Sequence, residues 1–145
     1  MGFGLPAAIG AALGAPGRRV ICLTGDGSIL MNVQELATLA EWNLPVTVVV
    51  FHNSGLGLVR QQQELFYGQR YVASSLASGP DFPALARAFG LAAWRVEGTM
   101  TPAQAFAEAL AHEGPSLVEV PVAPRALVLP MVAPGAANVD ALGRR

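Results

Sequence analysis

Uninterrupted apolar runs alternate with helical patterns along this chain, and the alternation predicts its architecture. Residues 19–23 form the first run, and residues 46–51 form a second, valine-rich run in which polar and apolar positions do not alternate. Such a run is typical of a parallel strand that is buried on both faces. Two shorter runs, at residues 92–96 and 116–120, predict further strands. Strands separated by helices indicate an α/β fold, namely an open parallel sheet with helices on both faces and right-handed crossovers.

The segments beside these strands carry helical patterns with recognisable ends. Asn32, with Glu35 three positions later, resembles a capping box, and so does Thr101 with Gln104. The first helical segment is apolar almost all round, so we expect it to be buried. The expected helices cover residues 5–13, 33–40, 57–65, 81–89 and 101–113.

Composition limits the classes of protein to which the chain can belong. Its 145 residues suffice for one domain with a substantial core. Only 13% of them are charged and 52% are apolar, whereas soluble domains are typically about 25% charged. We therefore expect that partners bury much of the surface or that the chain is part of a larger protein. The net charge of −1 leaves no basic stripe for nucleic acid, and no apolar run reaches the ~18 residues that a membrane helix needs.

Cysteine usage and the first residues point to a cytoplasmic protein. Cys22 is the single cysteine and lies inside an apolar strand, which excludes a disulfide framework and a cysteine zinc site and suits a reducing compartment. Residues 1–14 carry no basic residue, so they do not resemble a signal peptide. Proline and glycine become frequent from Pro121 onward, without periodicity. We therefore expect a folded domain over residues 1–122 and an extended, irregular tail over residues 123–145.

Polar residues follow the first two predicted strands at the point where each strand ends. Gly25-Asp26-Gly27-Ser28 follows the first strand, and His52-Asn53 ends the second. Ligands bind beyond the carboxyl ends of the strands in open parallel sheets. Magnesium prefers oxygen ligands, usually a few protein oxygens together with phosphate oxygens. Asp26 and Asn53 offer a carboxylate and a neutral amide oxygen, and the glycines allow the backbone to approach a diphosphate closely.

Simpler interpretations exist for these residues. Gly-Asp-Gly is most often an ordinary turn, and only the matching position of Asn53 favours a metal site over a turn. Adjacent strand residues point to opposite faces, so we expect that His52 does not serve the same site as Asn53 and is packed or hydrogen-bonded elsewhere. His112 is expected to be solvated late in a surface helix.

An ordered series of motifs resembles one enzyme family along essentially the whole chain. The spacing of GDG and Asn53 is similar to the thiamine diphosphate motif. The complete series resembles the C-terminal, thiamine-diphosphate-binding domain of the acetolactate synthase large catalytic subunit, most closely the bacterial isozyme I type. The matching segments are residues 1–11, 25–28, 32–36, 53–63, 65–67, 129–132 and 134–138.

The resemblance implies a role for individual residues. It implies that Asp26, the Asn53 side chain and the Gly55 backbone carbonyl bind Mg²⁺, and that Met1 and Leu58 line the rings of the cofactor. Gln62 stands where many members of the family have a tryptophan that favours 2-oxobutyrate as the second substrate. The residues expected to contact the diphosphate are Gly25, Gly27, Ser28, Leu56 and Gly57.

The resemblance also implies properties of the complete enzyme. It decarboxylates pyruvate and condenses the product with a second 2-oxoacid, pyruvate or 2-oxobutyrate, in branched-chain amino-acid biosynthesis. An activating glutamate comes from the N-terminal domain of a neighbouring subunit, and FAD is bound mainly by a middle domain. This chain, which resembles an N-terminally truncated cofactor domain, therefore has no catalytic residue of its own and is expected to be inactive alone. The family also implies a homodimer or homotetramer, with or without a small regulatory subunit.

Two other functions remain open from the sequence. The chain could belong to another thiamine-diphosphate-dependent carboligase or decarboxylase, although the Gln61–Gln63 segment and the tail argue against this. It could also be a non-catalytic α/β module that binds other subunits. Binding of thiamine diphosphate that requires magnesium would separate the module from both enzymes.

Overall fold

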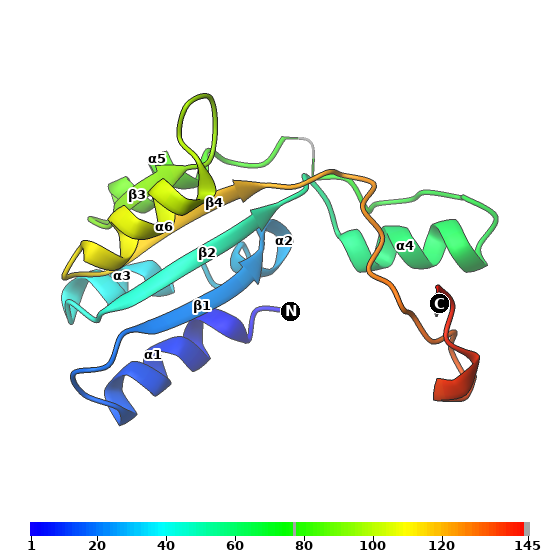
Figure 1. Cartoon of the computed structure of the whole chain (residues 1–145), viewed down its shortest axis with the longest axis horizontal. Helices are drawn as coiled ribbons and strands as arrows, with labels where there is room; N and C mark the ends of the chain where they lie inside the picture. Colours follow the sequence, from blue (N-terminus) through cyan, green and yellow to red (C-terminus); the bar gives the residue numbers. More distant parts are fainter. Residues whose placement is uncertain (77, 144–145) are drawn as a thin grey trace.

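The computed structural model describes residues 1–76 and 78–143, and its centre is a parallel sheet of four strands (Figure 1). The strand order is β1-β2-β4-β3, and every neighbouring pair runs parallel. The predicted fold class is confirmed, with strand ends that differ by one or two residues. The strands are β1 (Val20–Gly25), β2 (Val46–His52), β3 (Ala92–Arg95) and β4 (Ser116–Pro121).

All five predicted helices are present, and a short additional helix follows β1. This additional helix, α2, starts at Asp26 itself, so the predicted metal ligand lies in a helical turn and not in an open loop. The α-helices are α1 (Gly4–Gly14), α2 (Asp26–Ile29), α3 (Glu35–Glu41), α4 (Gly57–Phe66), α5 (Phe82–Ala88) and α6 (Pro102–Ala111).

Helices cover both faces of the sheet, as the apolar pattern predicts. Helices α1, α3 and α5 share one core with β2, whose Val46, Val48 and Val50 are fully buried on that side. On the other face, Ala105 and Ala109 of α6 pack against Val118 of β4. The central strand β2 is therefore buried on both sides, which explains why its sequence lacks polar alternation.

One predicted capping box is confirmed and the other is wrong. Thr101 accepts a hydrogen bond from the backbone of Gln104, and the Gln104 side chain accepts one from the backbone of Thr101. Asn32 does not cap α3, which begins at Glu35 without a side-chain cap. Its amide instead donates to the carbonyl of Gly2, so a contact with the distant N-terminal segment replaces the local one.

Helix α1 is buried on one face only, contrary to the expectation from its composition. Leu5, Ala8, Ile9 and Ala12 face the core, whereas Leu13 is 47% exposed. A helix packed on one face of a four-stranded sheet buries only the stripe that contacts the sheet, even where its other residues are apolar.

The last part of the chain lies beside α4, beyond the carboxyl ends of the strands (Figure 1). After β4, the described residues contain one short 3₁₀ helix, η1 (Asn138–Asp140), and an isolated bridge between Met131 and Leu142. The division at residue 122 stays a prediction, and the last two residues of the predicted tail lie outside the described residues. None of the helices within the described residues has the length and apolar character needed to cross a membrane.

Candidate cofactor-binding site

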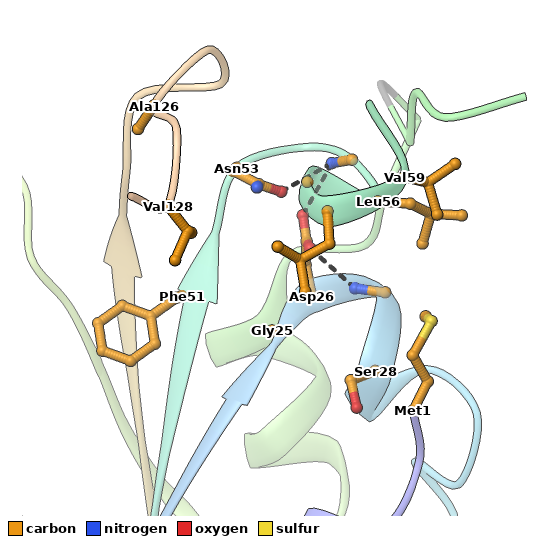
Figure 2. A pocket seen from close by; sticks show the side chains of 14 residues that line it. Met1, Gly25, Asp26, Ser28, Phe51, Asn53, Leu56, Val59, Ala126 and Val128 are labelled. Atoms are coloured by element: carbon orange, nitrogen blue, oxygen red, sulfur yellow. Dashed lines mark hydrogen bonds between the residues drawn. The ribbon is translucent and has the colours of Figure 1, made fainter. Parts of the chain in front are cut away.

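A cavity of about 500 Å³ opens beyond the carboxyl ends of β1 and β2 (Figure 2). All ten residues that the sequence assigns to cofactor binding line this cavity, although they come from the N-terminus, the end of β1 with α2, and the β2–α4 connection with the first turn of α4. They are Met1, Gly25, Asp26, Gly27, Ser28, Asn53, Gly55, Leu56, Gly57 and Leu58.

Backbone amides hold the Asp26 side chain just beyond the carboxyl end of β1. Strand β1 ends at Gly25 and α2 begins at the next residue, so the Asp26 side chain lies where the sheet edge meets the cavity. One carboxylate oxygen, Oδ1, accepts a hydrogen bond of 2.8 Å from the Gly27 backbone nitrogen, and Oδ2 accepts one of 3.2 Å from that of Gly55. The residue is only 3% exposed.

The fold brings Asn53 to the same place. Its Oδ1 atom accepts a 3.1 Å hydrogen bond from the Gly55 nitrogen that also donates to Asp26 (Figure 2). Because one N–H group lies within 3.2 Å of both oxygens, the carboxylate and the amide oxygen are neighbours. The paired placement expected from the two strand ends is therefore present, since β1 and β2 are adjacent and parallel.

The charge of this site suits a bound cation. Among the described residues, no arginine nitrogen lies within 4.0 Å of the Asp26 carboxylate, and the nearest basic group is His52 Nε2 at 3.8 Å. A buried carboxylate without a permanent positive partner is costly. A divalent cation that binds Asp26 together with neutral oxygens removes this cost, so the residues present fit Mg²⁺.

Three glycines of the site allow chain segments to approach more closely than any side chain permits. A Cβ atom on Gly27 would lie 2.6 Å from Leu56 Cδ2, and one on Gly57 would lie 2.6 Å from Asn53 Nδ2. A Cβ atom on Gly55 would lie 2.8 Å from the Ser74 carbonyl oxygen. These close approaches leave room beside Asp26 that side chains would otherwise fill.

Apolar side chains form the rest of the cavity. Met1 and Leu58 are 69% and 60% exposed, so their apolar surface is open to a ligand in the cavity. Four lining residues were not anticipated from the sequence. Phe51 and Val59 lie next to predicted elements of the site and could have been found from that position, whereas the tail carried no signal. The four are Phe51, Val59, Ala126 and Val128.

Gln62, the predicted substrate residue, lies outside the cofactor cavity. It is exposed on α4 and lines a second cavity of about 320 Å³, which shares Val59 with the first. The buried glutamine is its neighbour Gln61, at 1% exposure. The Gln61 side chain accepts a 2.7 Å hydrogen bond from the Val128 nitrogen and donates one of 3.0 Å to the Val128 carbonyl. Sequence reasoning missed this contact, which fastens the tail against α4 beside the cavity.

The expectation that His52 stands apart from the site is only half correct. Its Nδ1 atom is hydrogen-bonded to Glu119 Oε1 at 2.6 Å, so His52 does have a hydrogen-bond partner outside the site, as expected. Its Nε2 atom nevertheless lies 3.8 Å from Asp26 Oδ2. Strand β2 ends at His52, so the alternation of faces does not continue to Asn53, and both side chains remain near the carboxylate. His112 is exposed, as expected.

The charge on the second Glu119 oxygen is balanced from β3. Arg95 Nε donates a 2.7 Å hydrogen bond to Glu119 Oε2, and this bond raises the pKa of the Arg95 guanidinium above its ordinary value. Arg95 also contacts Asp81 at 3.0 Å. The pKa of Asp81 is lowered, first by the hydrogen bond from the Ala84 backbone nitrogen.

Comparison with known proteins identifies the type of domain. Residues 1–120 match the family described as "Thiamine pyrophosphate enzyme, C-terminal TPP binding domain". The chain is 45% identical over 143 residues to the acetolactate synthase isozyme 1 large subunit of Escherichia coli K12, covering 99% of this chain and 25% of that protein. It is 46% identical over 144 residues to the acetolactate synthase large subunit of Parasynechococcus marenigrum, covering 99% of this chain and 23% of that protein. The chain thus spans about a quarter of the length of these curated relatives.

Solved structures agree with the family match. The thiamine diphosphate-dependent 4-hydroxybenzoylformate decarboxylase of Rhodococcus jostii RHA1 superposes with a TM-score of 0.78 at 34% identity, over 85% of this chain and 23% of that one. The benzoylformate decarboxylase of Polynucleobacter necessarius gives a TM-score of 0.76, also at 34% identity, over 85% and 24%. With a family match over residues 1–120 and a shared fold, this chain belongs to the C-terminal TPP-binding domains of the thiamine pyrophosphate enzymes.

Proposed function

We propose that this chain is the cofactor domain of an acetolactate synthase large subunit and binds thiamine diphosphate through Mg²⁺. The observation that carries the proposal is the buried Asp26 carboxylate, which shares the Gly55 N–H with Asn53 and has no arginine partner among the described residues. A cation held by Asp26, the Asn53 oxygen and the Gly55 carbonyl neutralises that carboxylate and leaves coordination positions for diphosphate oxygens.

Different residues of the cavity would contact the diphosphate and the rings of the cofactor. Gly25, Gly27, Ser28 and Gly57 offer backbone and hydroxyl groups close to the metal ligands, where a diphosphate would lie. Leu56 is expected beside the diphosphate as well. Met1 and Leu58 line the apolar part, which suits the rings and excludes water from them. When bound, thiamine diphosphate supplies the carbanion-stabilising chemistry itself, and the protein orients it and tunes its surroundings.

The identity of the complete enzyme rests on its relatives. Identities of 45% and 46% over almost the whole chain are to proteins named acetolactate synthase large subunits, which supports pyruvate and 2-oxobutyrate as substrates in branched-chain amino-acid biosynthesis. We extend the proposal to FAD in a further domain, to a cytoplasmic homodimer or homotetramer and to association with a small regulatory subunit. The exposure of Ile21 and Leu23 on the sheet, 50% and 63%, supports burial by further polypeptide.

A thiamine-diphosphate-dependent decarboxylase is the second candidate. Two of the solved structures that share the fold are a thiamine diphosphate-dependent 4-hydroxybenzoylformate decarboxylase and a benzoylformate decarboxylase, each at 34% identity. The higher identity to acetolactate synthases favours a carboligase, in which a second 2-oxoacid accepts the product of decarboxylation.

The proposal is tested by calorimetric titration of thiamine diphosphate, with Mg²⁺ or with EDTA. The titrated protein is the complete enzyme subunit of which this domain is proposed to be a part, called the full-length protein below. We expect binding only with Mg²⁺, and acetolactate as the product from pyruvate. Acetaldehyde as the main product would favour the decarboxylase, and absence of binding under both conditions would favour the non-catalytic module. The 145-residue chain alone should form no acetolactate, because the expected activating glutamate belongs to another domain.

Replacing Gln62 by tryptophan should shift the choice of the second substrate towards 2-oxobutyrate. A flat apolar side chain would contact the additional methyl group, and one methylene in an apolar pocket is worth about 1–3 kcal/mol, or roughly 10-fold or more in selectivity. A competition assay of both 2-oxoacids, scored by acetohydroxybutyrate against acetolactate, measures the shift. Ala107→Trp, at an exposed position on α6 that lines neither cavity, is the matched control. An unchanged product ratio in Gln62→Trp would show that Gln62 takes no part in substrate choice.

A further inference from the structure

A chain of polar groups centred on the buried Glu119 runs behind the turn of residues 53–55 and ends at His52. Glu119 on β4 is only 2% exposed and uses both carboxylate oxygens. Oε2 accepts from Arg95 on β3, and Oε1 lies 2.6 Å from His52 Nδ1 on β2. Three neighbouring strands are therefore joined by one carboxylate at their carboxyl ends. A fully bonded polar group in a protein interior fixes the positions of its partners.

The hydrogen bond to Glu119 determines which ring nitrogen of His52 carries the proton. An ionised carboxylate can only accept, so the proton of this hydrogen bond lies on His52 Nδ1. The ring also packs edge-on against Phe82, with 5.3 Å between the ring centroids. Its second nitrogen, Nε2, is thereby directed at the turn after β2, where Ser54 Oγ lies at 3.3 Å and Asp26 Oδ2 at 3.8 Å.

Ser54 lies between the two ligands that this turn would contribute to the metal. It has a φ angle of +57°, a left-handed conformation that costs a residue other than glycine roughly 1–2 kcal/mol. Its carbonyl accepts a 2.8 Å hydrogen bond from Leu76, which holds the turn from one side. The contact with His52 holds it from the other side. Asn53 and Gly55 can converge with Asp26 only while this strained turn is maintained.

We propose that His52, anchored by Glu119, is a positioning residue that holds the 53–55 turn so that Asn53 and Gly55 converge with Asp26 on Mg²⁺. The inference rests on the proposed function and deepens it. His52 acts through Ser54 and is not itself a ligand, because Mg²⁺ strongly prefers oxygen and His52 Nδ1 is occupied by Glu119. Groups that orient metal ligands in this way typically change metal affinity by about 10–100-fold when they are removed.

The test is the Mg²⁺ concentration that gives half-maximal thiamine diphosphate binding to the full-length protein, measured by calorimetry for a set of variants. We expect His52→Leu to raise this concentration about 10–100-fold, with a smaller loss of thiamine diphosphate affinity at saturating Mg²⁺. His52→Asn keeps an amide donor for Glu119 and an acceptor for the turn, so it should recover most of the affinity. Ser54→Ala removes only the hydroxyl at a partly exposed position and should raise the concentration several-fold without unfolding the protein.

His112→Leu is the matched control, because it removes the other histidine of the chain at an exposed site. It should leave the Mg²⁺ requirement unchanged. Wild-type Mg²⁺ affinity in both His52→Leu and Ser54→Ala would overturn the inference. So would a general loss of thermal stability in which His52→Asn is no better than His52→Leu, since that pattern indicates a purely structural pair. If the wild-type protein fails to bind thiamine diphosphate with Mg²⁺, the proposed function itself is wrong.

Discussion

Asp26→Asn should eliminate Mg²⁺-dependent binding of thiamine diphosphate at concentrations that saturate the wild-type protein. The asparagine removes the charge and, because it has a single side-chain oxygen, keeps an acceptor for only one of the Gly27 and Gly55 amides. Loss of a partner that merely orients a ligand costs about 10–100-fold in metal affinity, so we expect more than ~100-fold for the single charged ligand. Asp26→Ala should be at least as severe. Calorimetry of the full-length protein at increasing Mg²⁺ concentrations provides the measurement.

Although Asp26→Asn should eliminate cofactor binding, it should not lower the thermal stability of the metal-free protein. Without a cation, the buried carboxylate has no arginine partner among the described residues, so removing its charge should offset the one backbone hydrogen bond that is lost and leave the melting temperature unchanged or higher. Asp140→Ala, which removes an exposed carboxylate in the tail, is the control and should affect neither property. Mg²⁺-dependent binding of near wild-type strength in Asp26→Asn would contradict the assignment of this residue as a metal ligand.

Gly55→Ala should weaken cofactor binding strongly and destabilise the protein. The new Cβ atom would lie 2.8 Å from the carbonyl oxygen of Ser74, and that oxygen already accepts a 2.9 Å hydrogen bond from Leu56. Because the obstacle is backbone, the turn that carries Asn53 must move. We expect a loss of about 1–3 kcal/mol in the free energy of unfolding, as for other overpacked sites. The displaced ligands should also weaken Mg²⁺-dependent binding by at least ~10-fold, as altered metal-ligand orientation does.

Gly10→Ala provides the comparison for this substitution. Gly10 is exposed on α1, and no atom lies within 4 Å of the position that its Cβ would take. Alanine should therefore stabilise the helix by roughly 0.5–1 kcal/mol and leave cofactor binding unchanged. Denaturant unfolding gives both free energies, and calorimetry gives both affinities. If Gly55→Ala and Gly10→Ala have the same effects on the free energy of unfolding and on cofactor affinity, the close approach between Gly55 and Ser74 is not required for either property.

Local patterns in the sequence were sufficient to predict most of the fold and the polar part of the site. The apolar run of β2 and the capping residues of α6 report backbone periodicity and local hydrogen bonds, which neighbouring residues determine. Asp26 and Asn53 could be paired in advance because the carboxyl ends of adjacent parallel strands meet at one edge of the sheet. The resemblance to a known family then supplied the remaining cofactor residues and the role expected of Gln62.

Contacts between distant segments were decided only by the tertiary structure. Asn32 has the sequence context of a helix cap, yet its amide binds the carbonyl of Gly2. Gln61 looks like part of an exposed polar face, but it is buried against the backbone of Val128.

The sequence by itself determined the alternation of strands and helices, the carboxylate and amide at two strand ends, and the glycines around them. The tertiary structure decided that Val128 lines the cavity, that Gln62 lies outside it, and that His52 lies between Glu119 and the turn of residues 53–55. The physical reason is the range of the interactions. Secondary structure and turns depend on residues a few positions apart, whereas these side chains meet partners far along the chain after the sheet, α4 and the tail have packed together.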